Sequence, residues 1–328
     1  MPSPAKFAFL VHPLASFHRR VVGVRQADVR GALGLSYDSL EIGELCTFGV
    51  GDSLVGHIVT VPWLPAALLE DQQGAVNAMV EAVESLDGVR AVGLGSLLAV
   101  VGGRGETLAE RVDVPVTTGA AATAWAAAGN AVAAAACLGV SDVAVLGVGG
   151  AVGEAVARLL QQSGLSVVAG GRGRGPERRA EGLGIPLMPP EEAVRGCKVV
   201  VGAATSGGGL SPSALQEGTV LLDVALPSTL GPGELPRGVR VLAGEAVELP
   251  DAWRRGFWGW LYHLISGYGP SQIFACLAEP LVMVAMGRDR PYAQGRSVHP
   301  TDLSDFAQAA SSLGLKPRLA MGWSQVKI

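Results

Sequence analysis

Short apolar runs alternate along the chain with stretches in which apolar residues recur at helical spacing. The apolar runs predict buried strands, and they fall at residues 6–11, 57–61, 91–101, 114–116, 142–146, 165–169, 198–202, 220–223 and 239–242. The helical spacing predicts helices, and it falls at residues 64–86, 120–137, 151–162, 272–286 and 302–313. Strands that alternate with helices imply parallel pairing through right-handed crossovers. The middle of the chain therefore predicts the doubly wound sheet of an α/β protein.

The strand predicted at residues 142–146 leads into a glycine-rich turn and then into a helix. The turn can be aligned as Gly147-x-Gly149 or as Gly147-x-x-Gly150-x-x-Gly153. A strand, a tight glycine loop and a helix N-terminus form an anion site, because backbone N–H groups and the helix dipole point at the ligand. The usual ligand is a dinucleotide pyrophosphate, and the alternative is a tight turn without a ligand. The predicted cofactor contacts in this loop are Gly147, Gly149, Gly150, Ala151, Val152 and Gly153.

The end of the next strand predicts which dinucleotide is bound. NAD-binding proteins normally place a carboxylate there, but this strand is followed by Gly171-Arg172-Gly173-Arg174. Guanidinium groups pair well with phosphate, so Arg172 and Arg174 predict NADPH. The alternative is that they form a solvated basic turn together with Arg178 and Arg179.

Two further segments are predicted to contact the cofactor. Ala203, Ala204 and Thr205 follow a strand at the carboxyl edge of the sheet, where cofactors bind. Thr118 precedes the helix at 120–137 and is predicted to face the nicotinamide, with helix capping by Thr117 or Thr118 as the alternative.

These elements divide the chain into three predicted parts. Residues 1–116 predict an N-terminal α/β domain for the substrate, and residues 117–250 predict a Rossmann domain for the dinucleotide. After residue 250 the few aromatic residues gather in one stretch and helices follow, which predicts a C-terminal helical region over residues 251–328.

Composition and charge exclude several classes of function. The chain has 328 residues, of which 49% are hydrophobic, so it can form a sizeable core. Its net charge of −4 gives no bulk attraction to nucleic acid or to an anionic membrane. The four cysteines are far apart in the sequence, which argues against a zinc site or a disulfide framework. We expect a soluble, cytoplasmic protein that holds no metal. The composition still permits contact with a membrane surface. The apolar stretch 120–140 carries Asn130, and a buried helix is expected there.

Cys276 is the candidate for covalent chemistry. It lies in the first turns of the helix predicted at 272–286, where the helix dipole favours a thiolate. The other cysteines lie in apolar or strand contexts and are predicted to be buried and inert; they are Cys46, Cys137 and Cys197. Glu279 follows Cys276 by three residues, and it is an acid–base partner, a carboxylate bound elsewhere or a structural residue.

An NADPH site combined with a nucleophilic cysteine predicts a specific reaction. The thiolate attacks an acyl group, a thioester forms on the enzyme, and a hydride reduces it to an aldehyde. His12, after the first strand, is a candidate to orient the substrate or donate a proton, and the alternative is a histidine hydrogen-bonded to a nearby carbonyl. His263 is a weaker candidate to lower the thiol pKa by ion pairing.

The segment Gln272-Ile-Phe-Ala-Cys276-Leu-Ala-Glu279 resembles the cysteine motif of the cyanobacterial-type long-chain acyl-[acyl-carrier-protein] reductases. Further segments resemble that family in the same order along nearly the whole chain: Phe9-Leu-Val-His12 with Leu14-Ala-Ser16, Ala91-Val-Gly-Leu-Gly95-Ser96, Thr117-Thr-Gly119 with Thr123-Ala-Trp125, the glycine turn, and Ala243-Gly-Glu-Ala-Val-Glu248.

This resemblance implies an NADPH-dependent reductase that converts a long-chain fatty acyl thioester, on acyl carrier protein or coenzyme A, into a fatty aldehyde. It implies Cys276 as the nucleophile and Arg172 as the arginine that ends the second Rossmann strand. Pro280 departs from the family pattern and predicts a kink in the helix. Because acyl carrier protein is acidic, a basic patch is expected near the cysteine, formed by Arg254, Arg255, Arg288, Arg290 and Arg296.

Two other classes of function stay open. One is an NADP-dependent dehydrogenase of the shikimate-dehydrogenase type that acts on a small hydroxy acid, with Cys276 inert. That type normally needs a lysine–aspartate pair in the substrate domain, and Lys6 is the only lysine in the first 115 residues. The other is an NADPH-binding sensor or scaffold without catalysis.

Overall fold

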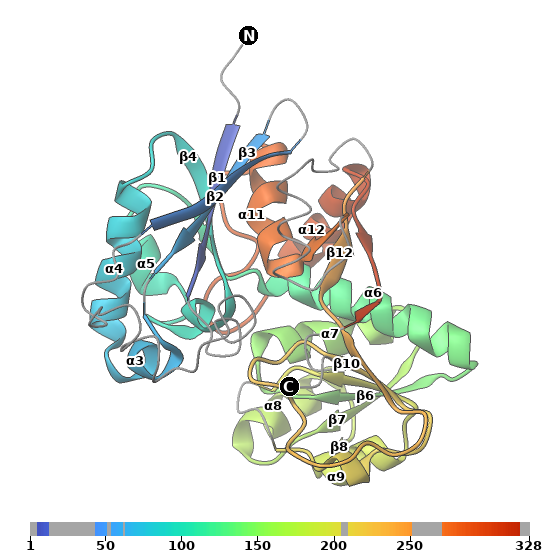
Figure 1. Cartoon of the computed structure of the whole chain (residues 1–328). Helices are drawn as coiled ribbons and strands as arrows, with labels where there is room; N and C mark the ends of the chain where they lie inside the picture. The colour runs from blue at the N-terminus through green and yellow to red at the C-terminus, as the bar shows by residue number, and fades with distance from the viewer. Residues whose placement is uncertain are drawn as a thin grey trace. The chain divides into compact units, whose positions relative to one another are not determined.

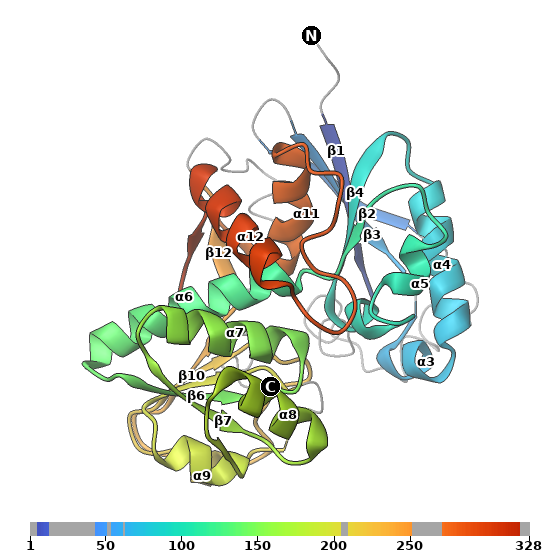
Figure 2. The same cartoon turned by 180° about the vertical axis from the view of Figure 1, so that it is seen from behind.

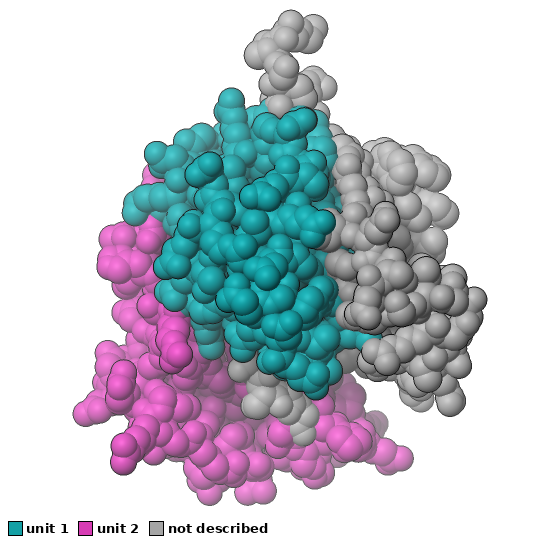
Figure 3. All heavy atoms as spheres, turned by 90° about the vertical axis from the view of Figure 1, so that its left-hand side faces the viewer, with its two compact units in different colours: residues 1–119, 250–266, 276–295 teal, residues 120–249, 267–275, 296–328 magenta. Residues whose placement is uncertain are grey.

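The computed structural model describes residues 5–12, 43–50, 54–61, 63–204, 209–250 and 271–321. These residues form two compact units, which Figure 3 shows in different colours. Unit 1 contains the described residues of 1–119, 250 and 276–295; unit 2 contains those of 120–249, 271–275 and 296–321. The residues after 250 are thus divided between the two units, whereas the sequence pattern predicts a separate C-terminal helical region.

Unit 1 is built on a five-stranded sheet with the order β2-β3-β1-β4-β5. The strands are β1 (Ala5–Val11), β2 (Gly43–Val50), β3 (Leu54–Thr60), β4 (Val89–Leu94) and β5 (Val116–Thr117). Strands β3, β1, β4 and β5 are parallel, and β2 pairs antiparallel with β3 at one edge. The chain extends the sheet first on one side of β1 and then on the other. The boundary between β1 and β4 is therefore a switch point, and ligands bind at the carboxyl ends of strands at such points.

Helices cover both faces of this sheet (Figure 1). They are α3 (Pro65–Glu70), α4 (Gln72–Glu84), α5 (Glu106–Ala109) and α11 (Ala275–Ala285), and a 3-10 turn, η2, covers Ser96–Val100. Helices α3 to α5 lie on one face and α11 lies on the other. Val76, Met79 and Val83 of α4 are buried in one cluster with Leu10 and Val92 of the sheet, as their helical spacing predicts.

Unit 2 contains a seven-stranded sheet with the order β15-β11-β10-β9-β6-β7-β8. The strands are β6 (Asp142–Leu146), β7 (Ser166–Gly170), β8 (Leu187–Met188), β9 (Val199–Gly202), β10 (Val220–Asp223), β11 (Arg240–Ala243) and β15 (Ala320–Met321). All neighbouring strands are parallel except β11 and β15. Numbered along the chain, the six parallel strands have the order 3-2-1-4-5-6, which is that of dinucleotide-binding Rossmann folds. The predicted α/β architecture is confirmed.

The helices of unit 2 lie on both faces of its sheet. They are α6 (Ala120–Leu138), α7 (Ala151–Gln162), α8 (Arg174–Leu183), α9 (Pro190–Arg195) and α12 (Pro300–Ser312), with a 3-10 turn, η3, at Pro212–Ala214. Helices α6 and α7 lie side by side on one face and α9 lies on the opposite face (Figures 1 and 2). A small sheet with the order β13-β12-β14 completes the unit; its strands are β12 (Ala246–Glu248), β13 (Gln272–Phe274) and β14 (Lys316–Pro317).

A buried polar side chain, Asn130, anchors the alanine-rich helix α6 within unit 2. By length and composition alone it could cross a membrane, but eleven of its nineteen residues are buried in the folded protein. The amide of Asn130 donates hydrogen bonds to the carbonyls of Gly244 at 2.8 Å, Arg318 at 3.3 Å and Ala246 at 3.5 Å. Asn130 therefore fixes α6 against the ends of β11, β12 and β14.

Three predicted elements differ from the structure. The single helix predicted at 64–86 is two helices, because Asp71 accepts a hydrogen bond from the backbone N–H of Gly74 at 2.8 Å and starts α4. The strand predicted at 91–101 ends at Leu94 and continues as a 3-10 turn. The helix predicted at 272–286 begins only at Ala275, since residues 272–274 pair with β12. That helix continues through Pro280 to Ala285, although Pro280 has no N–H to donate.

We predict that Asn130→Leu lowers the free energy of unfolding of the protein by about 1–3 kcal/mol, because buried carbonyls lose their donor. Urea denaturation measures this change. Gln162→Leu is the control: Gln162 is exposed at the end of α7, and its substitution should change stability by less than about 0.5 kcal/mol. Equal stability of Asn130→Leu and the wild type would contradict the structural role of this amide.

Candidate functional site

The glycine loop of unit 2 brings α7 close to the end of β6. Gly147 has a φ of +89°, which favours glycine, and a Cβ there would lie 2.6 Å from the backbone of Ala203 and Ala204. A Cβ on Gly153 would lie 2.2 Å from the Gly147 carbonyl oxygen. The backbone N–H of Gly150 donates to that same carbonyl at 2.9 Å and Gly150 is the N-cap of α7. Gly147 and Gly153 are thus the sterically required positions, which favours the alignment Gly147-x-x-Gly150-x-x-Gly153.

This loop lies at the switch point of the unit 2 sheet. It follows β6, and Ala203 and Ala204 follow the neighbouring parallel strand β9. The backbone N–H of Ala203 donates to the Leu146 carbonyl at 2.9 Å, which holds the two strand ends together. In doubly wound sheets a dinucleotide binds at this place, with its pyrophosphate at the helix N-terminus. Thr205 lies outside the described residues.

The arginines after β7 are not equivalent. Arg172 forms an ion pair with Glu191 of α9 at 2.7 Å. A hydrogen bond from its own backbone N–H lowers the pKa of Glu191, and the Arg172 guanidinium lowers it further, so Glu191 is ionised at neutral pH and offsets the charge of Arg172. Arg174 is exposed and has no hydrogen bond or ion pair within the described part of the chain. Arg174 is thus the better placed cation for a 2′-phosphate, and the sequence pattern gave no sign of Glu191 because it belongs to a distant helix.

Asp223 organises the segment that follows β10 at the same edge of the sheet. Its carboxylate accepts hydrogen bonds from the Ser228 hydroxyl at 2.6 Å, the Thr229 hydroxyl at 2.8 Å, the Thr229 N–H at 3.0 Å and the Ala225 N–H at 3.2 Å. Burial raises the pKa of Asp223 and these hydrogen bonds oppose that effect, with a net increase. The strand-end position of Asp223 was the one sequence signal of this role.

In unit 1, polar residues gather at the carboxyl edge of the parallel sheet. His12 follows β1 and Ser96 follows β4, the two strands at the switch point. The His12 Nε2 atom lies 3.1 Å from the Ser96 hydroxyl, and the backbone N–H of Leu97 donates to Nε2 at 3.2 Å. His12 is buried and Ser96 is exposed. Ser96 has a φ of +53°, a strained conformation for a residue with a Cβ and one that recurs at functional sites.

A second polar group of unit 1 is buried at the end of β5. The Thr117 hydroxyl contacts the Glu279 carboxyl group of α11 and the carbonyl oxygen of Ala293, the latter at 3.0 Å. Because a hydroxyl carries one proton, Thr117 can donate to both acceptors only by sharing it; if it donates to Ala293, Glu279 must supply the proton of the other bond. Thr118 donates to the same Ala293 carbonyl through its N–H and its hydroxyl. The sequence leaves three roles open for Glu279, and the structure shows that its carboxyl group is hydrogen-bonded to Thr117.

Cys276 is the second residue of α11 and is partly accessible to solvent. Gly119, with a φ of +75°, lies directly against it: a Cβ on Gly119 would lie 2.4 Å from the Cys276 Cβ and 2.5 Å from its Cα. The thiol thus lies at the N-terminus of an apolar helix, where the dipole favours a thiolate.

The other cysteines differ from their prediction in one case. Cys197 is buried, which raises the pKa of its thiol and keeps it protonated. Cys137, predicted to be buried, is exposed because α6 ends one residue later. The side chain of Cys46 and the residues His263, Arg254 and Arg255 lie outside the described residues. No cluster of three or more His, Cys, Asp or Glu residues suited to a metal occurs in the described part of the chain.

The comparisons with known proteins include a distant curated relative. No family model matches the chain. The chain is similar to Aminotransferase PigE from Serratia sp. (strain ATCC 39006), with 27% identity over 339 residues. The match covers 94% of this chain and 39% of that protein, so the chain spans about two fifths of the relative's length.

Solved structures that are similar to this chain include a dehydrogenase and a transhydrogenase. Shikimate 5-dehydrogenase (AroE) from Thermus thermophilus, in complex with NADP(H) and shikimate, has 16% identity and a TM-score of 0.37, with 93% of this chain and 99% of that chain covered. Transhydrogenase from Sinorhizobium meliloti has 14% identity and a TM-score of 0.34, with 70% of each chain covered. TM-scores this low do not establish a shared fold. The Rossmann-type assignment of unit 2 therefore depends on its own strand order.

The family resemblance stated from the sequence is wrong. A curated relative whose match covers 94% of this chain is an aminotransferase and not an acyl-[acyl-carrier-protein] reductase. The segments that carried the resemblance are short and rich in glycine, alanine and threonine. Tight turns and close helix packing require such residues in many α/β proteins.

We predict that Gly119→Ala slows alkylation of Cys276 by iodoacetamide, because the new methyl group overlaps the Cys276 Cβ. The same overlap should cost about 1–3 kcal/mol of stability. Peptide mass spectrometry measures the alkylation rate, with the exposed Cys137 as an internal standard. Gly139→Ala is the matched control, since Gly139 also has a positive φ of +65° but no atom within 4 Å of an added Cβ. Equal rates in the two variants would show that Gly119 does not constrain the thiol.

Proposed function

We propose that this chain is an NADP(H)-dependent oxidoreductase, in which unit 2 binds the cofactor and unit 1 supplies residues that act on the substrate. One observation carries the proposal: six parallel strands in the Rossmann order, with the glycine loop at their switch point. The cradle suits a dinucleotide, because side chains at Gly147 and Gly153 would fill the space between loop, strand and helix. Arg174 supplies a cation for the 2′-phosphate. When bound, the nicotinamide supplies or accepts a hydride.

For unit 1 we propose that the carboxyl edge of the sheet handles the proton that accompanies hydride transfer. A hydroxyl–carbonyl interconversion needs a group that gives a proton to oxygen or takes one from it. Ser96 is exposed and lies within hydrogen-bond distance of the buried His12 imidazole. In this proposal Ser96 contacts the substrate oxygen and His12 holds the proton behind it. Lys6 is unsuited to that role: it is the second residue of β1, at the amino end of the strand, and donates to the Asp87 carbonyl at 3.1 Å.

The first proposed substrate class is therefore a small hydroxy acid or its oxo form, in an NADP-dependent dehydrogenase reaction. Such a reaction does not use Cys276. Turnover should then depend on Ser96 and His12 and should be retained in Cys276→Ala.

A second proposed class, an acyl thioester, is favoured by the partly accessible thiol of Cys276 at the N-terminus of α11. The Cys276 sulfur would bond to the acyl carbon while the bond to the carrier sulfur breaks and the carrier thiol leaves with a proton. A hydride would then replace the Cys276 sulfur on that carbon, which releases an aldehyde. The carrier in this proposal is coenzyme A or an acidic carrier protein, and Arg288 and Arg290 of unit 1 would supply positive charge for binding it.

The cofactor assignment predicts opposite effects of two substitutions. Arg174→Gln should weaken NADPH binding by about fivefold, which corresponds to about 1 kcal/mol for an exposed charge pair. Glu191→Gln should strengthen it, because Arg172 loses its carboxylate partner. NADH binding should change little in either variant. Fluorescence titration of each reduced cofactor measures these affinities.

The same titration tests the proposed function as a whole. Gly153→Ala should abolish binding of both cofactors, since α7 must move away from the loop, whereas Gly196→Ala is a control with no atom closer than 3.9 Å to the added Cβ. A wild-type protein that binds neither cofactor would overturn the proposal.

Intact-protein mass spectrometry separates the two substrate classes. Wild type and Cys276→Ala are each mixed with acyl thioesters of several chain lengths, without cofactor. We expect no acyl adduct on either protein if the substrate is a hydroxy acid, and NADP⁺ reduction with a hydroxy acid panel should then survive Cys276→Ala. An acyl-sized mass increase on the wild type alone, removed by NADPH with aldehyde release, would establish the thioester reaction instead.

A further inference from the structure

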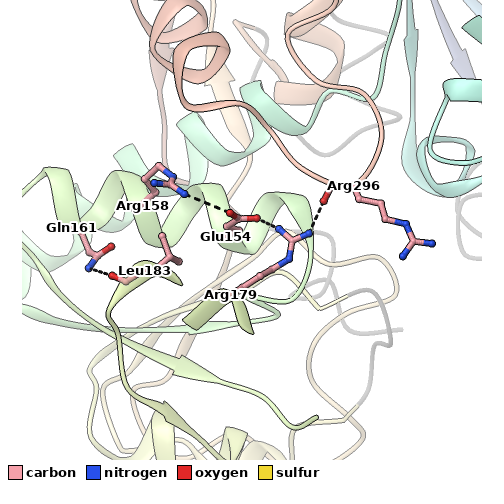
Figure 4. Close-up of polar contacts among 6 residues, drawn as sticks. All are labelled: Glu154, Arg158, Gln161, Arg179, Leu183 and Arg296. Carbon is pink, nitrogen blue, oxygen red and sulfur yellow. Dashed lines mark hydrogen bonds and ion pairs between the residues drawn. The ribbon is translucent and has the colours of Figure 1, made fainter. Parts of the chain in front are cut away.

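A basic hollow lies between α7 and α8 of unit 2, and Glu154, which follows Gly153 of the glycine loop, is one of its lining residues. Its volume is about 280 Å³. Two helices and one loop residue line it: Glu154 and Arg158 of α7, Arg178, Arg179, Gly182 and Leu183 of α8, and Ser297. Figure 4 shows Glu154, Arg158 and Arg179 pointing toward one another across the two helices. Three guanidinium groups and one carboxylate give the lining a net charge of +2 in a chain whose total charge is −4.

The contacts in the hollow hold two of these guanidinium groups in place. Glu154 forms ion pairs with Arg158, at 3.5 Å, and with Arg179. Arg179 also donates to the carbonyl oxygen of Arg296 at 2.9 Å, which ties α8 to the segment before α12. One carboxylate thus holds two like charges side by side, an arrangement that a bound anion would stabilise further.

Donors remain in the hollow after these contacts. A guanidinium group has five N–H donors, and Arg158 uses one terminal nitrogen, for Glu154. Arg178 is exposed and has no hydrogen bond or ion pair within the described residues. Gly182, another lining residue, is surrounded by open space, since no atom lies within 4 Å of a Cβ added there.

We infer that this hollow binds a phosphate group, as inorganic phosphate or as the phosphate of a small phosphorylated molecule. Planar guanidinium forks match the geometry of phosphate oxygens and bind them through paired hydrogen bonds. A phosphate dianion would balance the net charge of +2 in the lining. The site is distinct from the 2′-phosphate site proposed above, because neither Arg172 nor Arg174 lines it.

A bound phosphate would also connect α7, which follows the glycine loop, with α8, which follows β7. Glu154 belongs to the first turn of α7, directly after the loop, and Arg178 and Arg179 belong to the middle of α8. Binding should therefore stabilise unit 2 whether or not a dinucleotide is present. This inference does not rest on the proposed oxidoreductase activity.

Isothermal titration calorimetry of the full chain with inorganic phosphate, at constant ionic strength and without cofactor, tests the inference. We expect one site with a dissociation constant of about 1 mM or lower and a rise in melting temperature with phosphate relative to chloride. Arg178→Gln should weaken binding by about tenfold, as expected for loss of a charged hydrogen-bond donor. Arg240→Gln, an exposed arginine of β11 outside the hollow, is the control and should bind phosphate like the wild type.

Four results would overturn the inference. Binding detected only near 100 mM or above would indicate an adventitious ion only. Binding that Arg178→Gln and Arg240→Gln weaken equally would indicate general charge attraction. Loss of phosphate binding in the presence of saturating NADP⁺, but not NAD⁺, would assign the hollow to the cofactor. A titration with malonate separates phosphate from carboxylate recognition: weaker binding of malonate is expected, and equal or tighter binding would also contradict the assignment.

Discussion

The close contact between Gly147 and Gly153 is the constraint on which unit 2 depends. With no side chain on Gly153, the first turn of α7 can lie against the Gly147 carbonyl. That contact sets the direction in which α7 leaves β6 and leaves the N-terminal N–H groups of α7 at the end of the strand. The same glycine, Gly147, touches the backbone after β9, so the two strands at the switch point meet around one loop. The position of any dinucleotide follows from this packing rather than from any single polar side chain.

Unit 1 places its polar residues by the same topological rule. Its strands β1, β4 and β5 are parallel, and their carboxyl ends carry His12, Ser96 and Thr117. The three residues are far apart in the sequence and lie at one edge because parallel strands end at the same side of a sheet. Helix α11 then adds Cys276 and Glu279 to this unit. In the function proposed above, unit 2 would hold the cofactor and the short segments after the strands of unit 1 would determine the substrate.

The elements of the fold and the residues of the candidate site differ in how well the sequence predicts them. Helix α7 was predicted at its observed bounds, because the glycine turn marks its start and the apolar stripe continues to its end. The start of α11 was not predicted correctly. Ile273 and Phe274 fit a strand as well as a helix, and the pairing with β12 decides that they form a strand. The Asp71 cap within residues 64–86 was a local signal that the continuous helical spacing obscured. The site partners Glu191 and Ser96 could not be predicted, because their roles depend on residues that are 19 and 84 positions away.

The sequence by itself determined the α/β class, the glycine loop and its following helix, and the candidate thiol Cys276. These features are local: they follow from side-chain periodicity and from glycine at positions where backbones approach closely. Only the tertiary structure decided that Glu191 forms an ion pair with Arg172 and that Thr117 forms a hydrogen bond with Glu279. It also decided that Gly119 packs against Cys276. Finally, it decided that Arg158 and Arg179 share the carboxylate of Glu154. Each of these contacts joins separate elements, and a single chain's pattern carries no information on which elements become neighbours until the strand order is known.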